Sequence, residues 1–327
     1  MGSTIDELSR DGTTLDVDSI REKFNAAVAE MGVPLAKIAP ATGVAYATLS
    51  AWKNGTYGGD NQRIAADVQK WLVTREAGAR MNIALPKAPS FQRTPTALAI
   101  VDVLEAAQTL PDIAIVVGGA GIGKTTAIRW YAAHASNVWV VTLEPSTRSL
   151  GAMLNEVGMA MGLPRTQSSA ILSDQIRRRM TGSSGLLVID ESQNLTLECI
   201  DQLRTFHDRA EIGLVMAGNE TIARRLNGEQ AAADFAPLVS RVGQRFRQKG
   251  LTVKDREILI EAWGLEDEGA RKLARAVAAK PGAARSMTKV LRMAYLLAGN
   301  AGRAAPNEGD VKASWEQLSE PNERRAA

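Results

Sequence analysis

The stretch "GGAGIGKTT", residues 118–126, decides the fold of this chain. It comes directly after the apolar run "IAIVV" (113–117), and a segment of helical character follows it. It fits the pattern G-x-x-x-x-G-K-[ST] at every specified position. Glycines let the backbone curl so that several N–H groups point at one phosphate, and the N-terminus of the next helix adds partial positive charge. The stretch therefore predicts a phosphate-binding loop between a strand and a helix.

The chemistry of this loop predicts ATP and Mg²⁺ as cofactors. Lys124 is expected to reach the β- and γ-phosphates, and Thr125 is expected to offer its hydroxyl to Mg²⁺. The remaining nucleotide contacts within the loop are expected from Gly118, Gly119, Ala120, Gly121, Ile122, Gly123 and Thr126.

A second motif, "LLVIDESQN" (186–194), predicts the catalytic half of the site. Its apolar residues indicate a buried strand, and Asp190 follows at the end of that strand. A carboxylate there can hold Mg²⁺ and its water shell, while Glu191 can orient and activate the attacking water. An acid pair that only favours a helix N-terminus is the alternative. Because a phosphate loop precedes the motif, Asp190 and Glu191 predict hydrolysis and not binding alone.

Short β-branched apolar runs alternate with helical stretches from about Thr96 onward. The runs are 113–117, 138–143, 185–190 and 212–218. Such alternation predicts a parallel sheet with helices on both faces. The last run ends in Asn219, whose amide is placed to contact the γ-phosphate or the attacking water; the alternative is that Asn219 only caps the next helix.

Composition and patterning predict the domain organisation. The expected parts are a polar N-terminal arm (1–18), a helical module (19–76), a proline-containing linker (77–95), an α/β core (96–253), a helical C-terminal domain (254–318) and a tail (319–327). A single cysteine fits a reducing cytoplasm, and no apolar run approaches the roughly 18 residues of a membrane helix.

The segment 33–72 has the spacing of a helix-turn-helix. Apolar side chains expected in its small core are Leu35, Ile38, Ala39, Val44, Leu49 and Trp52, with Gly43 in the turn. The second helix would expose Tyr46, Thr48, Ser50 and Lys53 toward phosphates or base edges. Because these side chains are mostly small, weak contact with DNA is favoured over operator reading. A helical protein-docking module is the alternative.

The order of the motifs resembles that of the AAA+ ATPase family. "LVSRVGQRF" (238–246) and a helical segment with "KPGAAR" (280–285) follow the motifs above, so the resemblance covers roughly residues 96–300. It implies a γ-phosphate sensor at Asn219 and a second sensor at Arg285, which would contact the nucleotide. It also implies an arginine donated to the neighbouring subunit's nucleotide, for which Arg241 matches best and Arg245 is the alternative.

The expected fold is therefore α/β: a P-loop AAA+ parallel sheet, a helical C-terminal lid, and a small all-α helix-turn-helix domain. Nearly the whole chain also resembles the Mu B family of phage transposition proteins. "NVWVVTLEPS" (137–146), "GLVMAGN" (213–219) and "KPGAARSMTKVLRMA" (280–294) look like segments of that family. The resemblance implies an ATPase that, with ATP bound, coats double-stranded DNA without sequence preference as helical filaments. It further implies delivery of that DNA to the transposase, stimulation of strand transfer, and hydrolysis stimulated by both partners.

Several basic or polar positions are candidates for contact with DNA. Arg177, Arg178 and Arg179 point over roughly 200° of a helix, so at least one is expected to form a structural ion pair. Thr147 and Arg148 follow a strand end. The segment Arg271–Gly299 contains lysines and arginines but no acidic residue. In this segment Arg271, Lys272, Arg275, Lys289 and Arg292 form a patch that fits DNA or the transposase.

Two other classes of protein remain open from the sequence. A helicase-loader type ATPase would prefer single strands and bind a helicase. A transcriptional regulator switched by ATP would bind one specific operator through its helix-turn-helix.

Overall fold

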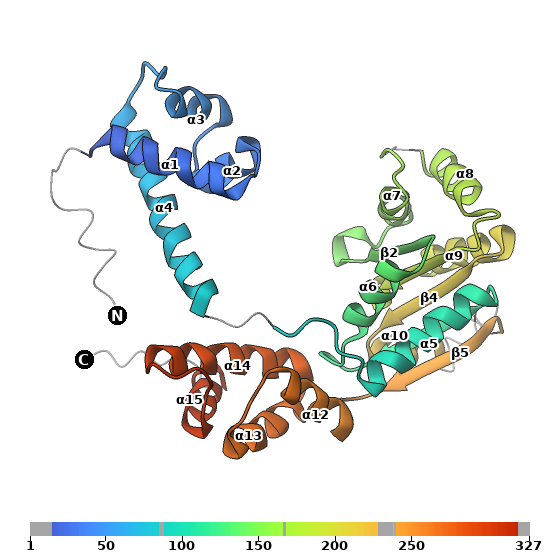
Figure 1. Cartoon of the computed structure of the whole chain (residues 1–327). Coiled ribbons are helices and arrows are strands. Elements are labelled where there is room, and N and C mark those ends of the chain that lie inside the picture. Colours follow the sequence, from blue (N-terminus) through green and yellow to red (C-terminus); the bar gives the residue numbers. More distant parts are fainter. Residues whose placement is uncertain (1–14, 85–87, 166–167, 228–237, 239, 320–327) are drawn as a thin grey trace. The chain divides into compact units, whose positions relative to one another are not determined.

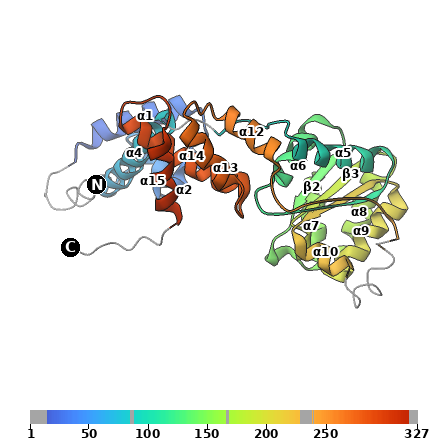
Figure 2. The same ribbon diagram turned by 90° about the horizontal axis from the view of Figure 1, so that it is seen from below.

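The computed structural model describes residues 15–84, 88–165, 168–227, 238 and 240–319 (Figures 1 and 2). The chain divides into two compact units, Met1–Pro86 and Lys87–Ala327. Most of the predicted N-terminal arm and most of the predicted tail lie outside the described residues. None of the described helices is long and apolar enough to cross a membrane.

In the described part of the first unit, residues 15–84, four helices surround a small apolar core. The helices are α1 (Val17–Met31), α2 (Leu35–Thr42), α3 (Tyr46–Lys53) and α4 (Asn61–Ala84). Phe24, Leu49 and Trp52 are fully buried at its centre. Gly43 ends α2 with φ 71°, a left-handed conformation that glycine adopts without strain. Helices α2 and α3 and the turn between them lie where the sequence predicts two helices and a turn. Their assignment as a DNA-binding helix-turn-helix stays a prediction.

The exposure of the α3 side chains differs in part from expectation. Tyr46 is exposed, whereas Thr48, Ser50 and Lys53 are half-buried. The predicted linker also begins inside a helix, because α4 continues to Ala84. Its sequence "EAGARMNIA" (76–84) is rich in helix-forming residues, and the first proline after it is Pro86.

The second unit begins with an α/β layer structure. Its helices are α5 (Pro95–Thr109), α6 (Lys124–His134), α7 (Leu150–Ala160), α8 (Ser169–Met180), α9 (Leu197–Ala210) and α10 (Glu220–Asn227). Its strands are β1 (Ile113–Gly118), β2 (Val138–Thr142), β3 (Leu186–Asp190), β4 (Gly213–Gly218) and β5 (Val242–Gln248). Two short 3₁₀ helices, η2 (Pro145–Thr147) and η3 (Ser192–Asn194), follow β2 and β3.

The strands form one parallel sheet in the order β2-β3-β4-β1-β5. Figure 2 shows α5 and α6 on one side of the sheet and α7, α8, α9 and α10 on the other. Side chains alternate accordingly: Val116 packs toward Ile100 and Ile128, whereas Ile115 packs into the core on the opposite face. The predicted parallel sheet with helices on both faces is confirmed.

Strand β5 was not among the runs recognised in the sequence. It is an edge strand in which half-buried Val242, Gln244, Phe246 and Gln248 alternate with exposed residues. Only two of these four side chains are apolar, so no continuous apolar run marks the strand. The alternation of half-buried and exposed positions, with Val242 and Phe246 on the same face, is the feature of the sequence that could have indicated a strand.

The described residues after β5 form the helices α12 (Val253–Ala262), α13 (Glu268–Ala278), α14 (Ala283–Asn300) and α15 (Glu308–Ser319). They bury their own apolar core, which includes Ile260, Leu291, Ala294 and Val311. These helices correspond to the predicted helical lid.

A buried carboxylate joins the first of these helices to the α/β layers. Asp255 of α12 has no solvent-exposed surface. Its carboxylate accepts hydrogen bonds from the backbone N–H and hydroxyl of Thr96, at 2.9 and 2.5 Å, and from those of Thr252, each at 2.7 Å. Burial alone would raise the pKa of Asp255, but the hydrogen bonds from Thr96 and Thr252 outweigh it and hold the pKa below its usual value. The ionised carboxylate therefore caps the N-termini of α5 and α12 together.

We expect the Asp255→Asn substitution to destabilise the second unit by about 1–3 kcal/mol, because an amide cannot accept all four hydrogen bonds. Since folding lowers the pKa, this stabilisation is complete above the unfolded-state value of about 4 and is lost as the pH falls through the folded-state value. Urea unfolding of both proteins at several pH values measures this. The gap in stability should shrink below about pH 4, and a gap independent of pH would contradict the account.

Candidate functional site

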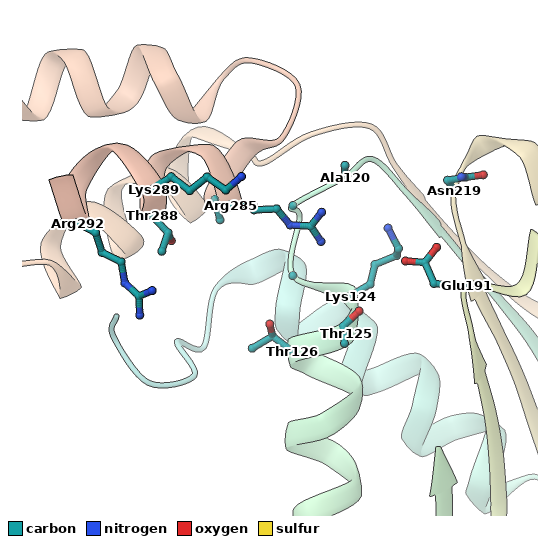
Figure 3. A pocket seen from close by; sticks show the side chains of 13 residues that line it. Ala120, Lys124, Thr125, Thr126, Glu191, Asn219, Arg285, Thr288, Lys289 and Arg292 are labelled. Carbon is teal, nitrogen blue, oxygen red and sulfur yellow. The ribbon is translucent and has the colours of Figure 1, made fainter. Parts of the chain in front are cut away.

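The ends of three neighbouring strands bring the predicted site residues together. The phosphate loop follows β1, Glu191 follows β3, and Asn219 follows β4, which lies between them in the sheet. They line one cavity of about 500 Å³, whose opposite wall is α14 (Figure 3). Ligand sites at the carboxyl ends of parallel strands are the rule in open α/β sheets.

The phosphate loop is shaped by glycines and touches the C-terminal helices. Gly121 and Gly123 have φ values of 79° and 99°, which side-chain-bearing residues rarely adopt. A methyl group on Gly121 would overlap the carbonyl oxygen of Gly282, and the N–H of Ala284 donates to the carbonyl of Gly121 at 3.2 Å. The loop is therefore held directly against the start of α14.

The predicted loop contacts do not all face the cavity. Ala120, Gly121, Gly123, Lys124, Thr125 and Thr126 line it. The side chain of Ile122 is instead buried against Leu251 and Ala283. Gly118 and Gly119 contribute carbonyl oxygens that accept hydrogen bonds from Lys124 Nζ at 2.7 and 3.1 Å.

Lys124 lies at the centre of the charges around the cavity. Burial lowers the pKa of its ammonium group, the carboxylates of Asp190 and Glu191 act in the opposite direction, and Arg285 lowers it further. In Figure 3 its side chain points toward Glu191, and Arg285 approaches from the other wall. A cation placed in this way is suited to the phosphates of a nucleotide.

The residues predicted to hold Mg²⁺ lie together. The Thr125 hydroxyl donates to Asp190 Oδ2 at 2.7 Å, and Asp190 is only 1% exposed. Asp190 Oδ1 accepts the backbone N–H of Glu191 at 2.9 Å. A hydroxyl and a carboxylate facing one phosphate loop are the oxygen ligands that Mg²⁺ takes beside a nucleotide, so these residues fit the ion.

Glu191 lines the cavity from an unusual backbone position. Its φ of 54° is left-handed, which is uncommon for a residue with a side chain. One carboxylate oxygen, Oε2, accepts a hydrogen bond from the side-chain amide of Gln193. No motif in the sequence indicates a role for Gln193.

Asn219 caps a helix and also lines the cavity. It lines the cavity, and its Oδ1 also accepts the N–H of Thr221 at 2.8 Å at the start of α10. The cap interpretation is therefore confirmed, and the contact of Asn219 with the γ-phosphate or the attacking water stays a prediction.

Helix α14 presents one face to the cavity. Arg285, Thr288, Lys289 and Arg292 all line it, with the spacing of a single helix face (Figure 3). Lys289 and Arg292 line the cavity and are exposed, and their predicted contact with DNA or the transposase stays a prediction. Thr288 was not predicted, although its helical spacing from Arg285 could have indicated it.

The rest of the predicted basic patch is partly neutralised. Arg275 pairs with Glu257 and Glu268 at 2.6 and 2.7 Å, and Arg271 pairs with the same two carboxylates at 3.6 and 3.7 Å. Both glutamates precede the acid-free segment Arg271–Gly299 in the sequence: Glu257 lies in α12 and Glu268 lies at the start of α13. Arg271 and Arg275 are therefore ion-paired, and their contact with DNA or the transposase stays a prediction.

The two arginines considered for a neighbouring subunit lie outside the cavity of their own subunit. Arg241 is exposed and donates from Nε to Asp208 Oδ1 near the end of α9, at 2.9 Å. Arg245 is exposed on the edge strand β5.

The arginines on α8 differ in their partners. Arg177 and Arg178 both pair with Asp174, at 2.5 and 2.7 Å, and hydrogen bonding from Arg177 holds the pKa of that carboxyl below its usual value. Arg179 is exposed and forms no ion pair within the described residues. The expectation that at least one of the three is an ion-pair partner is confirmed.

The loop after β2 is built around η2. The Thr147 hydroxyl accepts the N–H of Glu144 at 2.9 Å, so this side chain closes the turn. Arg148 is exposed, and its backbone carbonyl accepts a hydrogen bond from the thiol of Cys199 at 3.3 Å. Of the two predicted positions, Arg148 is the one with a free approach to solvent.

Two family profiles match this chain. The one described as "AAA domain" matches residues 108–226, and "Mu B transposition protein, C terminal" matches residues 240–318. Among curated proteins, the ATP-dependent target DNA activator B of Escherichia phage Mu is 32% identical over 307 residues, which are 93% of this chain and 96% of that protein. The Mu-like prophage FluMu DNA transposition protein B of Haemophilus influenzae is 33% identical over 272 residues, 82% and 93% of the two chains.

Solved structures share the fold at low identity. The Aeropyrum pernix ORC2 protein with ADPNP and ADP superposes with a TM-score of 0.54 and 18% identity, over 71% of this chain and 70% of that one. The Aeropyrum pernix ORC1 protein in complex with DNA gives 0.53 and 20%, over 73% and 69%. The P-loop, the sheet order and the curated relatives agree: the chain is an AAA+ ATPase and belongs to the Mu B family of DNA transposition proteins.

Proposed function

We propose that this protein binds double-stranded DNA without sequence preference when ATP is bound, and that it assembles as a filament on target DNA in the bacterial cytoplasm. It presents this DNA to the transposase and stimulates strand transfer. The observation that carries the proposal is the junction of the phosphate loop with α14, where Ala284 N–H donates to the Gly121 carbonyl. A nucleotide in this cavity contacts both parts of the unit, so its hydrolysis can change their arrangement.

We assign the chemistry of hydrolysis to the cavity residues. Lys124 and Arg285 bind the phosphates, and Asn219 contacts the γ-phosphate. Thr125 and Asp190 hold Mg²⁺, which neutralises charge on the phosphates when it is bound. Glu191 accepts the proton of the attacking water.

Arg241 is proposed to act on the nucleotide of the neighbouring subunit, with Arg245 as the alternative. The guanidinium of Arg241 is exposed and does not line the cavity of its own subunit. An ion pair with Asp208 holds it at the surface. A cation supplied across an interface stabilises charge that builds on the transferred phosphoryl group. It also makes hydrolysis depend on assembly.

For DNA we propose two surfaces. Arg179 and Arg148 are exposed cations on the second unit, and they suit phosphates of any sequence. On the first unit Tyr46, Thr48 and Lys53 of α3 form the other candidate surface. The neighbouring candidates are engaged within the chain, since Arg177 and Arg178 pair with Asp174 and the Thr147 hydroxyl accepts the N–H of Glu144.

The proposal predicts that ATP, but not ADP, supports tight binding to linear duplex DNA. Fluorescence anisotropy with duplexes of unrelated sequence should give similar affinities, and these should fall steeply with salt because phosphate contacts release counterions. Electron microscopy of the same samples should show regular filaments with ATP.

Three results would count against this function. Equal binding with ATP and ADP would contradict the nucleotide switch. A footprint at one sequence would indicate a transcriptional regulator. A preference for single strands, together with capture of a helicase, would indicate a helicase loader.

A further inference from the structure

The η3 turn, Ser192–Asn194, connects the catalytic strand end to the neighbouring strand through Gln193. The amide nitrogen of Gln193 donates to Glu191 Oε2, and its amide oxygen accepts the backbone N–H of Asn219 at 3.3 Å. Both ends of one side-chain amide are thus used to join the ends of β3 and β4. Because the oxygen faces an N–H and the nitrogen faces a carboxylate, the orientation of the amide is defined by its partners.

The surrounding residues hold this turn in place. Arg225 of α10 donates from Nη1 to the carbonyls of Gln193 and Leu195, at 3.0 and 2.8 Å. Asn194 donates from Nδ2 to the carbonyl of Leu143 at 3.0 Å. A methyl group on Gly218 would lie 2.7 Å from the amide oxygen of Gln193, so the last residue of β4 leaves space for that amide.

The consequence for Glu191 is that one carboxylate oxygen is anchored while the side chain still lines the cavity. A glutamate has three side-chain torsions, and an unanchored carboxylate would sample several directions. A general base must lie within about 2.6–3.2 Å of the oxygen whose proton it removes. An anchor on Oε2 leaves Oε1 available for that proton.

We propose that Gln193 is a positioning residue for hydrolysis: it sets the direction of the Glu191 carboxylate and fixes that carboxylate to the strand end that carries Asn219. This inference rests on the proposed function of Glu191 as the base. Gln193 itself does not line the cavity, so its removal should leave nucleotide binding intact.

Gln193→Met tests the anchor, because methionine has a similar length and donates no hydrogen bond. We expect kcat for ATP hydrolysis to fall about 10- to 100-fold, since small misplacements of a catalytic group cost rates of this order. The affinity for a fluorescent ADP analogue and the nucleotide-induced rise in Tm should stay close to wild type, which also reports correct folding. Gln193→Glu should lower kcat at least as strongly, because a carboxylate cannot donate to Glu191.

Asn194→Ala is the matched control. It removes a hydrogen bond of the same turn that does not touch Glu191, and kcat should stay near wild type. A loss of kcat equal to that of Gln193→Met would overturn the proposal, because the intact turn and not the amide would then be what matters. An unchanged or raised kcat in Gln193→Met would overturn it as well.

The Glu191→Gln protein distinguishes the proposed role of Glu191 as the base from the proposed role of Gln193 as its positioning residue. If it fails to hydrolyse ATP while Gln193→Met turns over normally, the base is confirmed and the positioning role is refuted. If Glu191→Gln turns over normally, the proposed base is wrong, and the inference about Gln193 is refuted with it.

Discussion

Lys124→Ala is expected to lose nucleotide binding and, with it, ATP-dependent binding to DNA. Lys124 is the one positively charged residue of the stretch 118–126. Its Nζ donates hydrogen bonds to the backbone carbonyls of Gly118 and Gly119. A charge-assisted hydrogen bond contributes about 1.5–3 kcal/mol. Losing such a bond to each of the β- and γ-phosphates corresponds to about two to four orders of magnitude in affinity.

Calorimetry with ATP and ADP measures the loss of nucleotide binding. Fluorescence anisotropy with labelled duplex measures the loss of ATP-dependent binding to DNA. Lys312→Ala, an exposed position on α15, is a suitable control that should behave as wild type. If Lys124→Ala formed filaments on DNA that still required ATP, the coupling between the cavity and DNA would be refuted.

The phosphate loop and the sheet could be predicted because local signals specify them. Glycines at fixed spacing after an apolar strand allow few other structures, and Asp190 and Asn219 follow strands that are themselves apolar. Parallel strands place their carboxyl ends at one edge, so the convergence of these residues follows from the strand pattern. The core of the first unit was predicted for the same reason, since Leu49 and Trp52 are large apolar residues at helical spacing.

The positions of charged side chains were less predictable. The sequence predicts Lys289 and Arg292 as part of a basic surface. It shows their charge and their positions along a helix, but it does not show which other part of the fold this helix packs against. Packing of α14 against the phosphate loop decides that they line the cavity. The neutralisation of Arg275 by Glu257 likewise depends on how α12 packs on α13, 18 residues away along the chain.

Gln193 shows a further limit. A glutamine in a polar turn carries no motif, and its contact with Glu191 arises from a left-handed backbone at Glu191 and a glycine at the end of β4. Neither feature can be read from the "DESQN" stretch (190–194) alone.

Glu191→Gln is expected to bind ATP normally, hydrolyse it slowly and remain on DNA. The substitution preserves the size of the side chain, and the amide oxygen of the new residue can still accept the hydrogen bond from Gln193. It removes the carboxylate that we propose as the general base, and general base catalysis typically contributes about 10²–10⁴-fold to the rate. Because the ATP-bound state then persists, dissociation from DNA should slow in proportion to hydrolysis.

Single-turnover hydrolysis and the rate of release from labelled duplex after an ATP chase measure both effects in one protein. Glu198→Gln, an exposed carboxylate at the start of α9, controls for the loss of a negative charge nearby. Slow hydrolysis with fast release from DNA would mean that release does not wait for cleavage of the nucleotide. Wild-type turnover would show instead that another group activates the water, which would leave Glu191 only the part of shaping the cavity.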